Sequence, residues 1–239
     1  MFQVERDFEK KVFHTKDIGL PYRSFVPNLI REGKKYPLLL FLHGAGERGT
    51  DNTAQLKHVV WQLFEKENAP CREAFVLVPQ CPEGSRWVDV AFNCGKFVQG
   101  EGKLSTPALD AAIELVRKTA EENPIDPDHI YVMGISMGGY GTWYALSHSN
   151  GLFAGGIPIC GGGDPAWASE LVPLAIHAFH SSDDGAVPVI GSRTMVDACQ
   201  KAGCKRIRYT EYNYTGHGSW ITAAETPGLI EWLFAQTKA

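Results

Sequence analysis

The stretch IYVMGISMGGYGTWYALSH, residues 130–148, decides the fold of this chain of 239 residues. Its apolar start is typical of a buried strand, and its second half is typical of a helix. Between the two lies the pattern G-x-S-x-G, with Ser136 at its centre. This pattern puts a serine on a strained turn from strand to helix, and its two glycines remove side chains that would clash in so tight a bend. Ser136 is therefore predicted to stand exposed at the helix start, where it can act as a nucleophile.

Around this stretch, strand-like and helix-like segments alternate from about residue 35 onward. Such alternation is typical of an α/β fold with helices on both faces of a mostly parallel sheet. No break in composition, repeat or low-complexity linker divides the chain, so we expect one catalytic domain over residues 1–239 with little or no cap. Strands are expected at 36–42, 74–78, 130–133, 156–160, 174–179 and 207–212, with an antiparallel entry at 11–14 and 22–27, and helices at 107–123, 139–148, 188–202 and 223–236.

A serine hydroxyl is a poor nucleophile unless a base takes its proton during the attack. His217 suits this role, because it lies between the last expected strand and the last expected helix. The acid that orients the histidine should come between the two in sequence, at the end of a strand. Residues 180–188, HSSDDGAVP, offer two adjacent carboxylates there. We predict Asp184 as the acid and assign Asp183 to the turn, although composition alone leaves both open.

Two backbone N–H groups are expected to hold the oxyanion that forms during acyl transfer. The residue after the nucleophile supplies the first, which is Met137 here. The second is expected from the loop after the buried strand 36–42, where small residues at 43–46 let the backbone approach a substrate. We choose Ala45 for this role, with Gly46 as the alternative and as a predicted substrate contact.

Residues 82–104 show no clear hydrophobic period, yet they contain Trp87, Phe92 and Phe97. Long loops without regular structure inside compact domains are usually functional. We therefore expect this segment to form part of the rim of the binding site. Trp87 is predicted to stack on the substrate from this rim, and the alternative is that it fills the core under the loop.

The composition excludes several classes of protein. The chain has 23 basic and 27 acidic side chains, a formal charge of −4, which gives no attraction for nucleic acid or anionic lipid. Its longest apolar runs fall far short of the roughly 20 residues that cross a membrane. The first seven residues lack the apolar core of a signal peptide. We expect a cytoplasmic protein, or a secreted one if a signal segment has been removed, and the sequence does not indicate an oligomeric state.

The six cysteines form no C-x-x-C pair and have no histidine at zinc-ligand spacing. We therefore expect no metal and no cofactor. Two pairs are close enough in sequence to form disulfides, Cys199 with Cys204 and Cys81 with Cys94, and free thiols are the alternative.

Taken together, these segments resemble the α/β-hydrolase superfamily. The narrower resemblance is to a predicted peptidase or carboxylesterase group related to feruloyl esterases and polyhydroxyalkanoate depolymerases. It rests on LHGAGERG at 42–49, IDPDHIY at 125–131, GISMGGYGTW at 134–143 and the segment 180–188. In that group the acid lies four residues after the histidine of an H-G-x-x-D-x-x-V-P-like segment, which is Asp184 here, although Ser181 replaces the usual glycine.

The resemblance implies hydrolysis of a small carboxylic ester by Ser136, His217 and Asp184 through an acyl-enzyme. With little or no cap, the site should favour short-chain or aryl esters such as feruloyl esters over long-chain fats. A serine peptidase or acyltransferase with the same triad is one alternative. A non-catalytic binding protein with the α/β-hydrolase fold is another.

Overall fold

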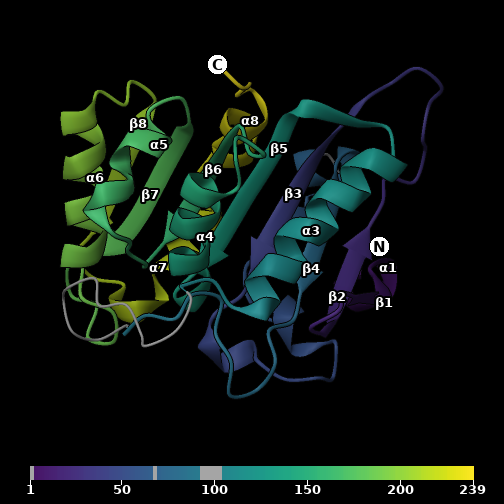
Figure 1. Cartoon of the computed structure of the whole chain (residues 1–239), viewed down its shortest axis with the longest axis horizontal. Helices are drawn as coiled ribbons and strands as arrows, with labels where there is room; N and C mark the ends of the chain where they lie inside the picture. Colours follow the sequence, from purple (N-terminus) through teal and green to yellow (C-terminus); the bar gives the residue numbers. More distant parts are fainter. Residues whose placement is uncertain (1–2, 67–68, 92–103) are drawn as a thin grey trace.

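The computed structural model describes residues 3–66, 69–91 and 104–239, and within them the chain forms an eight-stranded sheet (Figure 1). The strand order is β1-β2-β4-β3-β5-β6-β7-β8. β1 and β2 pair antiparallel, as do β2 and β4, and all the other neighbours pair in parallel. The strands are β1 (Glu9–His14), β2 (Gly19–Phe25), β3 (Tyr36–Leu42), β4 (Phe75–Pro79), β5 (Ile125–Ile135), β6 (Gly155–Ile159), β7 (Ala175–Ser181) and β8 (Ile207–Tyr212).

Helices cover both faces of this sheet (Figure 1), which confirms the expected mostly parallel α/β arrangement. One face packs against α3, α4, α5 and α6 in one apolar cluster, and the other packs against α2, α7 and α8 in a second. The helices are α1 (Val4–Asp7), α2 (Val60–Phe64), α3 (Pro107–Glu122), α4 (Met137–His148), α5 (Ala168–Leu171), α6 (Ile190–Ala202), α7 (Ser219–Ala224) and α8 (Leu229–Phe234).

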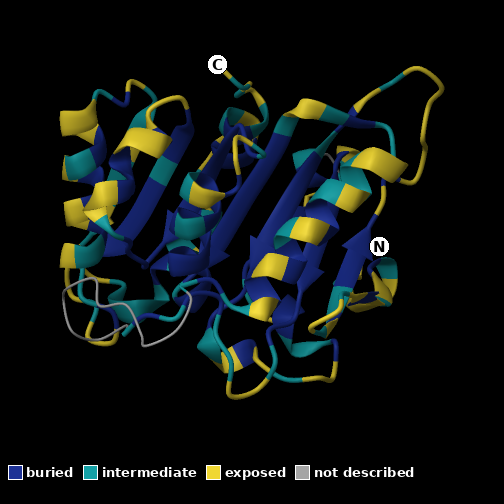
Figure 2. Cartoon of the chain, in the orientation of Figure 1, coloured by how far each residue is buried: buried dark blue, intermediate teal, exposed yellow. Residues whose placement is uncertain are grey.

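The central strand β3 shows why an unbroken apolar run suits this sheet. Successive side chains of a strand point to opposite faces. Leu38, Leu40 and Leu42 join the cluster under α3 and α4, while Leu39 and Phe41 join the cluster under α2 and α8. All five are fully buried, and Figure 2 shows most of the length of the central strands in dark blue. A strand covered on both faces has no solvent side on which a polar residue would be favoured.

The observed elements differ from the expected ones in two places. The helix expected at 223–236 is divided into α7 and α8, because Pro227 lacks an N–H and Gly228 adopts a left-handed φ of 72°. β5 also starts earlier than expected, at Ile125, with a shift of its register against β3 between Tyr36 and Leu38.

Residues 160–174, between β6 and β7, form only the 3-10 turn Pro165–Trp167 and α5, so no cap is inserted at this position.

Five cysteines lie in the described part of the chain, and all five are free and buried. Cys199 and Cys204 therefore form no disulfide, although both lie near the C-terminal end of α6. The other possible pair includes Cys94, which lies outside the described residues. None of the helices in residues 3–66, 69–91 and 104–239 has the length and apolarity needed to span a membrane.

Candidate active site

Ser136 joins β5 to α4 in a conformation that few non-glycine residues adopt. Its φ is 53° and its ψ is −116°, and its N–H donates to the Ile159 carbonyl of β6 at 2.9 Å. A Cβ on Gly134 would lie 2.3 Å from the Gly138 carbonyl oxygen, and a Cβ on Gly138 would lie 1.9 Å from the Leu42 carbonyl oxygen. Both glycines of the motif are therefore required by close backbone contacts, and the turn is as tight as the sequence predicted.

The three residues predicted as a triad lie together in a hydrogen-bonded chain. Ser136 Oγ is 2.9 Å from His217 Nε2, and His217 Nδ1 is 2.8 Å from Asp184 Oδ2. They follow the carboxyl ends of β5, β8 and β7, three parallel strands of one sheet. In open α/β sheets, this edge is where ligands bind. The order and contacts are those of a nucleophile, a base and an orienting acid.

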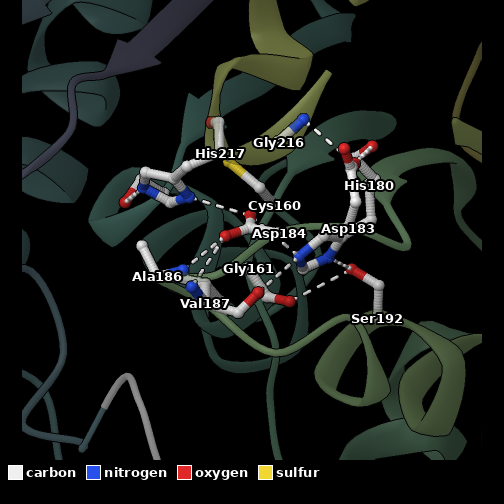
Figure 3. Close-up of polar contacts among 12 residues, drawn as sticks. Cys160, Gly161, His180, Asp183, Asp184, Ala186, Val187, Ser192, Gly216 and His217 are labelled. Atoms are coloured by element: carbon white, nitrogen blue, oxygen red, sulfur yellow. Dashed lines mark hydrogen bonds and ion pairs between the residues drawn. The ribbon is translucent and has the colours of Figure 1, made fainter. Parts of the chain in front are cut away.

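The surroundings of the two adjacent aspartates are different. Asp184 has a fully buried side chain, and its Oδ1 accepts from the N–H groups of Ala186 and Val187 at 2.9 Å each (Figure 3). Burial alone would raise the pKa of Asp184, but hydrogen bonds from the two neighbouring histidines and from these N–H groups lower it below its usual range. Asp183 is exposed and accepts from Gly216 N at 3.0 Å. The geometry therefore places Asp184, and not Asp183, against His217.

The loop 43–46 lies directly beside the nucleophile. A Cβ on Gly44 would lie 3.6 Å from Ser136 Cβ, so a larger residue would crowd the site. His43 Nδ1 contacts the Gly44 carbonyl at 2.6 Å, and Arg48 Nε donates to the Ala45 carbonyl at 2.8 Å. Buried and exposed side chains together hold the loop in this position.

Met137 is the first residue of α4, so its N–H has no acceptor within the helix and stays available to an oxyanion. Ala45 and Gly46 both belong to the 3-10 turn Ala45–Glu47 that follows Gly44. Met137 and Ala45 remain the predicted pair of donors, with Gly46 as the alternative for the second position.

Trp87 does not lie on a rim. Its side chain is fully buried, and its Nε1 donates to the His43 carbonyl at 3.0 Å. The centroids of the Trp87 and His43 rings lie 5.2 Å apart in an edge-to-face arrangement. The prediction that Trp87 stacks on a substrate is therefore wrong, because its indole N–H is used inside the core, beneath the loop 43–46. Phe92 and Phe97, the other aromatic residues of the expected rim, lie outside the described residues.

Residues 30–226 match the family model described as phospholipase/carboxylesterase. The chain belongs to this family. Membership places it among the serine hydrolases of the α/β-hydrolase fold, as the motifs predicted.

The individual proteins that this chain resembles include some described as esterases and some described as peptidases. A solved structure described as a thermostable esterase is 40% identical with a TM-score of 0.87, covering 98% of this chain and 64% of that one. A structure described as a ferulic acid esterase shares the fold at 15% identity and a TM-score of 0.69, covering 95% of this chain and 97% of that one. Among curated proteins, prolyl endopeptidase FAP of Bos taurus is 29% identical over 152 residues, which is 63% of this chain. The chain spans about a fifth of the length of that relative, 19%.

The site of this family member also contains two residues whose position the sequence analysis did not predict. His180 is fully buried on β7, and its Nε2 is 3.3 Å from Asp184 Oδ2. Cys160, at the end of β6, is buried beneath His217, and burial raises the pKa of its thiol. Of these two positions, only that of His180 could have been inferred from the sequence, because it stands four residues before the predicted acid in the segment 180–188.

Within the described part of the chain, one group of side chains could offer three ligand atoms to a metal ion. Atoms of Cys160, Asp184 and His217 lie within 4.8 Å of one another. Two of these three side chains are already hydrogen-bonded to each other at 2.8 Å, and His217 also contacts Ser136. The arrangement of these atoms is therefore that of a proton relay, and an ion bound among them would disrupt it.

Proposed function

We propose that this chain hydrolyses short-chain or aryl carboxylic esters through an acyl-enzyme on Ser136. The observation that carries the proposal is the unbroken chain of contacts from Ser136 Oγ to His217 and on to Asp184, at 2.9 and 2.8 Å. A serine with this pair of partners can attack a carbonyl carbon and pass its proton to the imidazole at the same time.

The reaction follows from these contacts. His217 Nε2 accepts the Ser136 proton as Oγ bonds to the ester carbonyl carbon, and Asp184 stabilises the imidazolium that results. The N–H groups of Met137 and Ala45 hold the oxyanion. His217 then gives its proton to the leaving alcohol. A water molecule attacks the acyl-enzyme with His217 again as the base, which releases the acid and restores Ser136.

The substrate class is inferred from the size of the segments around the site. Residues 160–174, between β6 and β7, add only one short helix and one 3-10 turn, so they form no lid of the kind that would enclose a long acyl chain. The similarity to one structure described as a thermostable esterase, at 40% identity, supports an ester substrate. The fold shared with a structure described as a ferulic acid esterase is consistent with an aryl acyl group.

A series of p-nitrophenyl and feruloyl esters tests the proposal. We expect turnover to fall as the acyl chain lengthens, and we expect a fluorophosphonate probe to label the native protein at Ser136. Ser136→Ala should abolish both, whereas Ser147→Ala, at the far end of the same helix, should abolish neither. Turnover of long-chain triglycerides well above that of short-chain esters would exclude the proposed substrate class. Absence of labelling in folded protein would favour a binding protein instead.

A peptidase is the second candidate, because the curated relatives matched are described as prolyl endopeptidases. An amide differs from an ester in its leaving group, an amine that must be protonated as the bond breaks. Matched ester and p-nitroanilide substrates with the same acyl group separate the two. A kcat/KM for the anilide equal to that for the ester would support a peptidase. Partition of the acyl group to an added alcohol would instead reveal an acyltransferase.

A further inference from the structure

Asp184 lies between two imidazoles, and only one of them has a role in the proposed reaction (Figure 3). Its Oδ2 is 2.8 Å from His217 Nδ1 and 3.3 Å from His180 Nε2. The side chains of His180 and Asp184 are both fully buried. A buried carboxylate must be held by hydrogen bonds to remain ionised and correctly oriented. His180 is the donor to Asp184 whose role the proposed reaction leaves open.

The hydrogen-bond partners of His180 show which ring nitrogen faces Asp184. Nε2 contacts two acceptors, Asp184 Oδ2 and the Val187 carbonyl oxygen at 3.0 Å, so Nε2 must carry a proton. Nδ1 contacts Ser192 Oγ at 2.8 Å. Ser192 Oγ also lies 3.1 Å from the Gly161 carbonyl oxygen, so this hydroxyl anchors the far side of the ring to α6 and to the loop after β6. The Nε2–H group is thus directed at Asp184 and Val187.

From this we infer that His180 is a positioning residue, which donates from Nε2 to Asp184 Oδ2 and fixes this carboxylate against His217 in the resting enzyme. The inference rests on the proposed role of Asp184 in the triad. It goes beyond that role, because it assigns the fourth member of the chain that begins at Ser136. His180 touches neither the nucleophile nor, by its complete burial, a substrate.

The other charged group near His180 already has a partner. Glu211 of β8 lies opposite His180 in the β7–β8 register. Its carboxylate is held by Arg193 through two hydrogen bonds, at 2.9 and 2.6 Å. Among the described residues, Asp184 contacts no arginine and depends on the two histidines and two backbone N–H groups. Removal of His180 would therefore leave Asp184 with one donor fewer.

The first test uses the unaltered protein and requires no turnover. In ¹⁵N-edited NMR of histidine-labelled protein at pH 7, Nε2 of His180 should show the signature of a protonated nitrogen. His43 is the internal reference, because its Nε2 accepts from Cys81 N at 2.9 Å and must therefore be unprotonated. An unprotonated Nε2 on His180 overturns the inference.

The second test compares two variants on an ester that the wild-type protein hydrolyses. His180→Leu removes the Nε2 donor, and we expect kcat to fall about 10–100-fold, the range known for partners that orient metal-binding side chains, with KM changed less than about 3-fold. His180→Gln retains a donor at the position of Nε2 and should keep more kcat than His180→Leu. His177→Gln, on the same strand with its ring bonded to Thr210 instead of the triad, is the control.

Equal loss of kcat in His180→Gln and His180→Leu, or wild-type kcat in His180→Leu, would overturn the inference. If His180→Leu fails to fold, the glutamine variant and the NMR measurement still decide. A low-field N–H resonance of the Asp184–His217 bond should shift in both variants and stay unchanged in His177→Gln. Failure of the esterase proposal is recognised separately, by activity that survives Ser136→Ala, and it leaves the NMR result on His180 intact.

Discussion

Asp184→Asn should disable the site through the tautomer of His217. The carbonyl oxygen of the new side-chain amide is expected to stay at the position of Oδ1, where the N–H groups of Ala186 and Val187 both require an acceptor. The amide NH₂ then points at His217 Nδ1 and His180 Nε2. His217 can accept this hydrogen bond only with its proton on Nε2, the nitrogen that must take the proton of Ser136.

The size of the effect follows from comparable triads. Replacement of the acid by its amide lowers kcat about 10⁴-fold in a serine protease with the same arrangement, and at 1.36 kcal/mol per tenfold this is about 5.4 kcal/mol of transition-state stabilisation. The assay is kcat on a short-chain p-nitrophenyl ester, corrected by titration of active sites with a fluorophosphonate. Circular dichroism and the unfolding midpoint confirm that the variant is folded.

Asp183→Asn is the matched control, since the two carboxylates are neighbours in sequence and carry the same charge. Asp183 accepts from Gly216 N at 3.0 Å and from the Ser181 hydroxyl, and an amide carbonyl can accept both bonds. We therefore expect kcat within about 10-fold of wild type, a loss of at most about 1.4 kcal/mol. A loss of several orders of magnitude in Asp183→Asn, with Asp184→Asn active, would refute the assignment of the acid.

Three further predictions concern stability. Burial lowers the pKa of both His43 and His177 to about 4, whereas histidines of the unfolded chain titrate near 6.5. The free energy of unfolding, measured in urea, should therefore be highest above about pH 6.5 and fall as the pH drops toward 4, with a shallower fall in His177→Gln. Gly138→Ala puts a methyl group 1.9 Å from a carbonyl oxygen of β3 and should cost about 1–3 kcal/mol or more, whereas Gly46→Ala meets nothing within 4 Å and should change the free energy of unfolding by less than about 0.5 kcal/mol. Trp87→Phe loses the bond to His43 and should cost about 1–3 kcal/mol with KM unchanged; wild-type stability of this variant would refute the structural role of the indole N–H.

The sequence predicted those parts of the site that depend on order along the chain and on backbone geometry. Parallel strands end at one edge of a sheet, so Ser136, Asp184 and His217, each after a strand, had to lie near one another. The flanking glycines were readable as well, because only a residue without a side chain fits where two backbones meet. The choice of Asp184 over its neighbour agreed with the resemblance, and the geometry supports it through two backbone N–H donors.

Features that depend on contacts between side chains far apart in the sequence could not be predicted from the sequence. Trp87 lies in a segment without period, and nothing in such a segment distinguishes a buried aromatic ring from an exposed one. Its burial depends on contact with His43, 44 residues away. The role of His180 likewise depends on Ser192 of α6 and on Gly161, neither of which the spacing of residues 180–188 reveals. The break between α7 and α8 is different, since Pro227 and Gly228 already mark it in the sequence.

Two neighbouring strands are followed by residues in a strained backbone conformation, and one of these residues is the nucleophile. Ser136 follows β5 with φ 53°, and Cys160 follows β6 with φ 42°. Each such residue costs of order 1–3 kcal/mol and persists only where surrounding structure holds it. Here the neighbouring strand does so in both cases. Ser136 N donates to the Ile159 carbonyl at 2.9 Å, and Cys160 N donates to the Phe179 carbonyl at 2.8 Å.

These two bonds extend the parallel pairing one residue past the ends of β5 and β6, so the sheet itself fixes the direction in which Ser136 points. His180 lies in β7, Asp184 follows the end of β7, and the segment that leads to His217 follows the end of β8. The nucleophile and the relay that serves it are thus positioned by consecutive strands of one rigid element. Relaxation of the turn at Ser136 would require breaking a bond to β6, which explains why a conformation unfavourable for a single serine is stable in the folded chain.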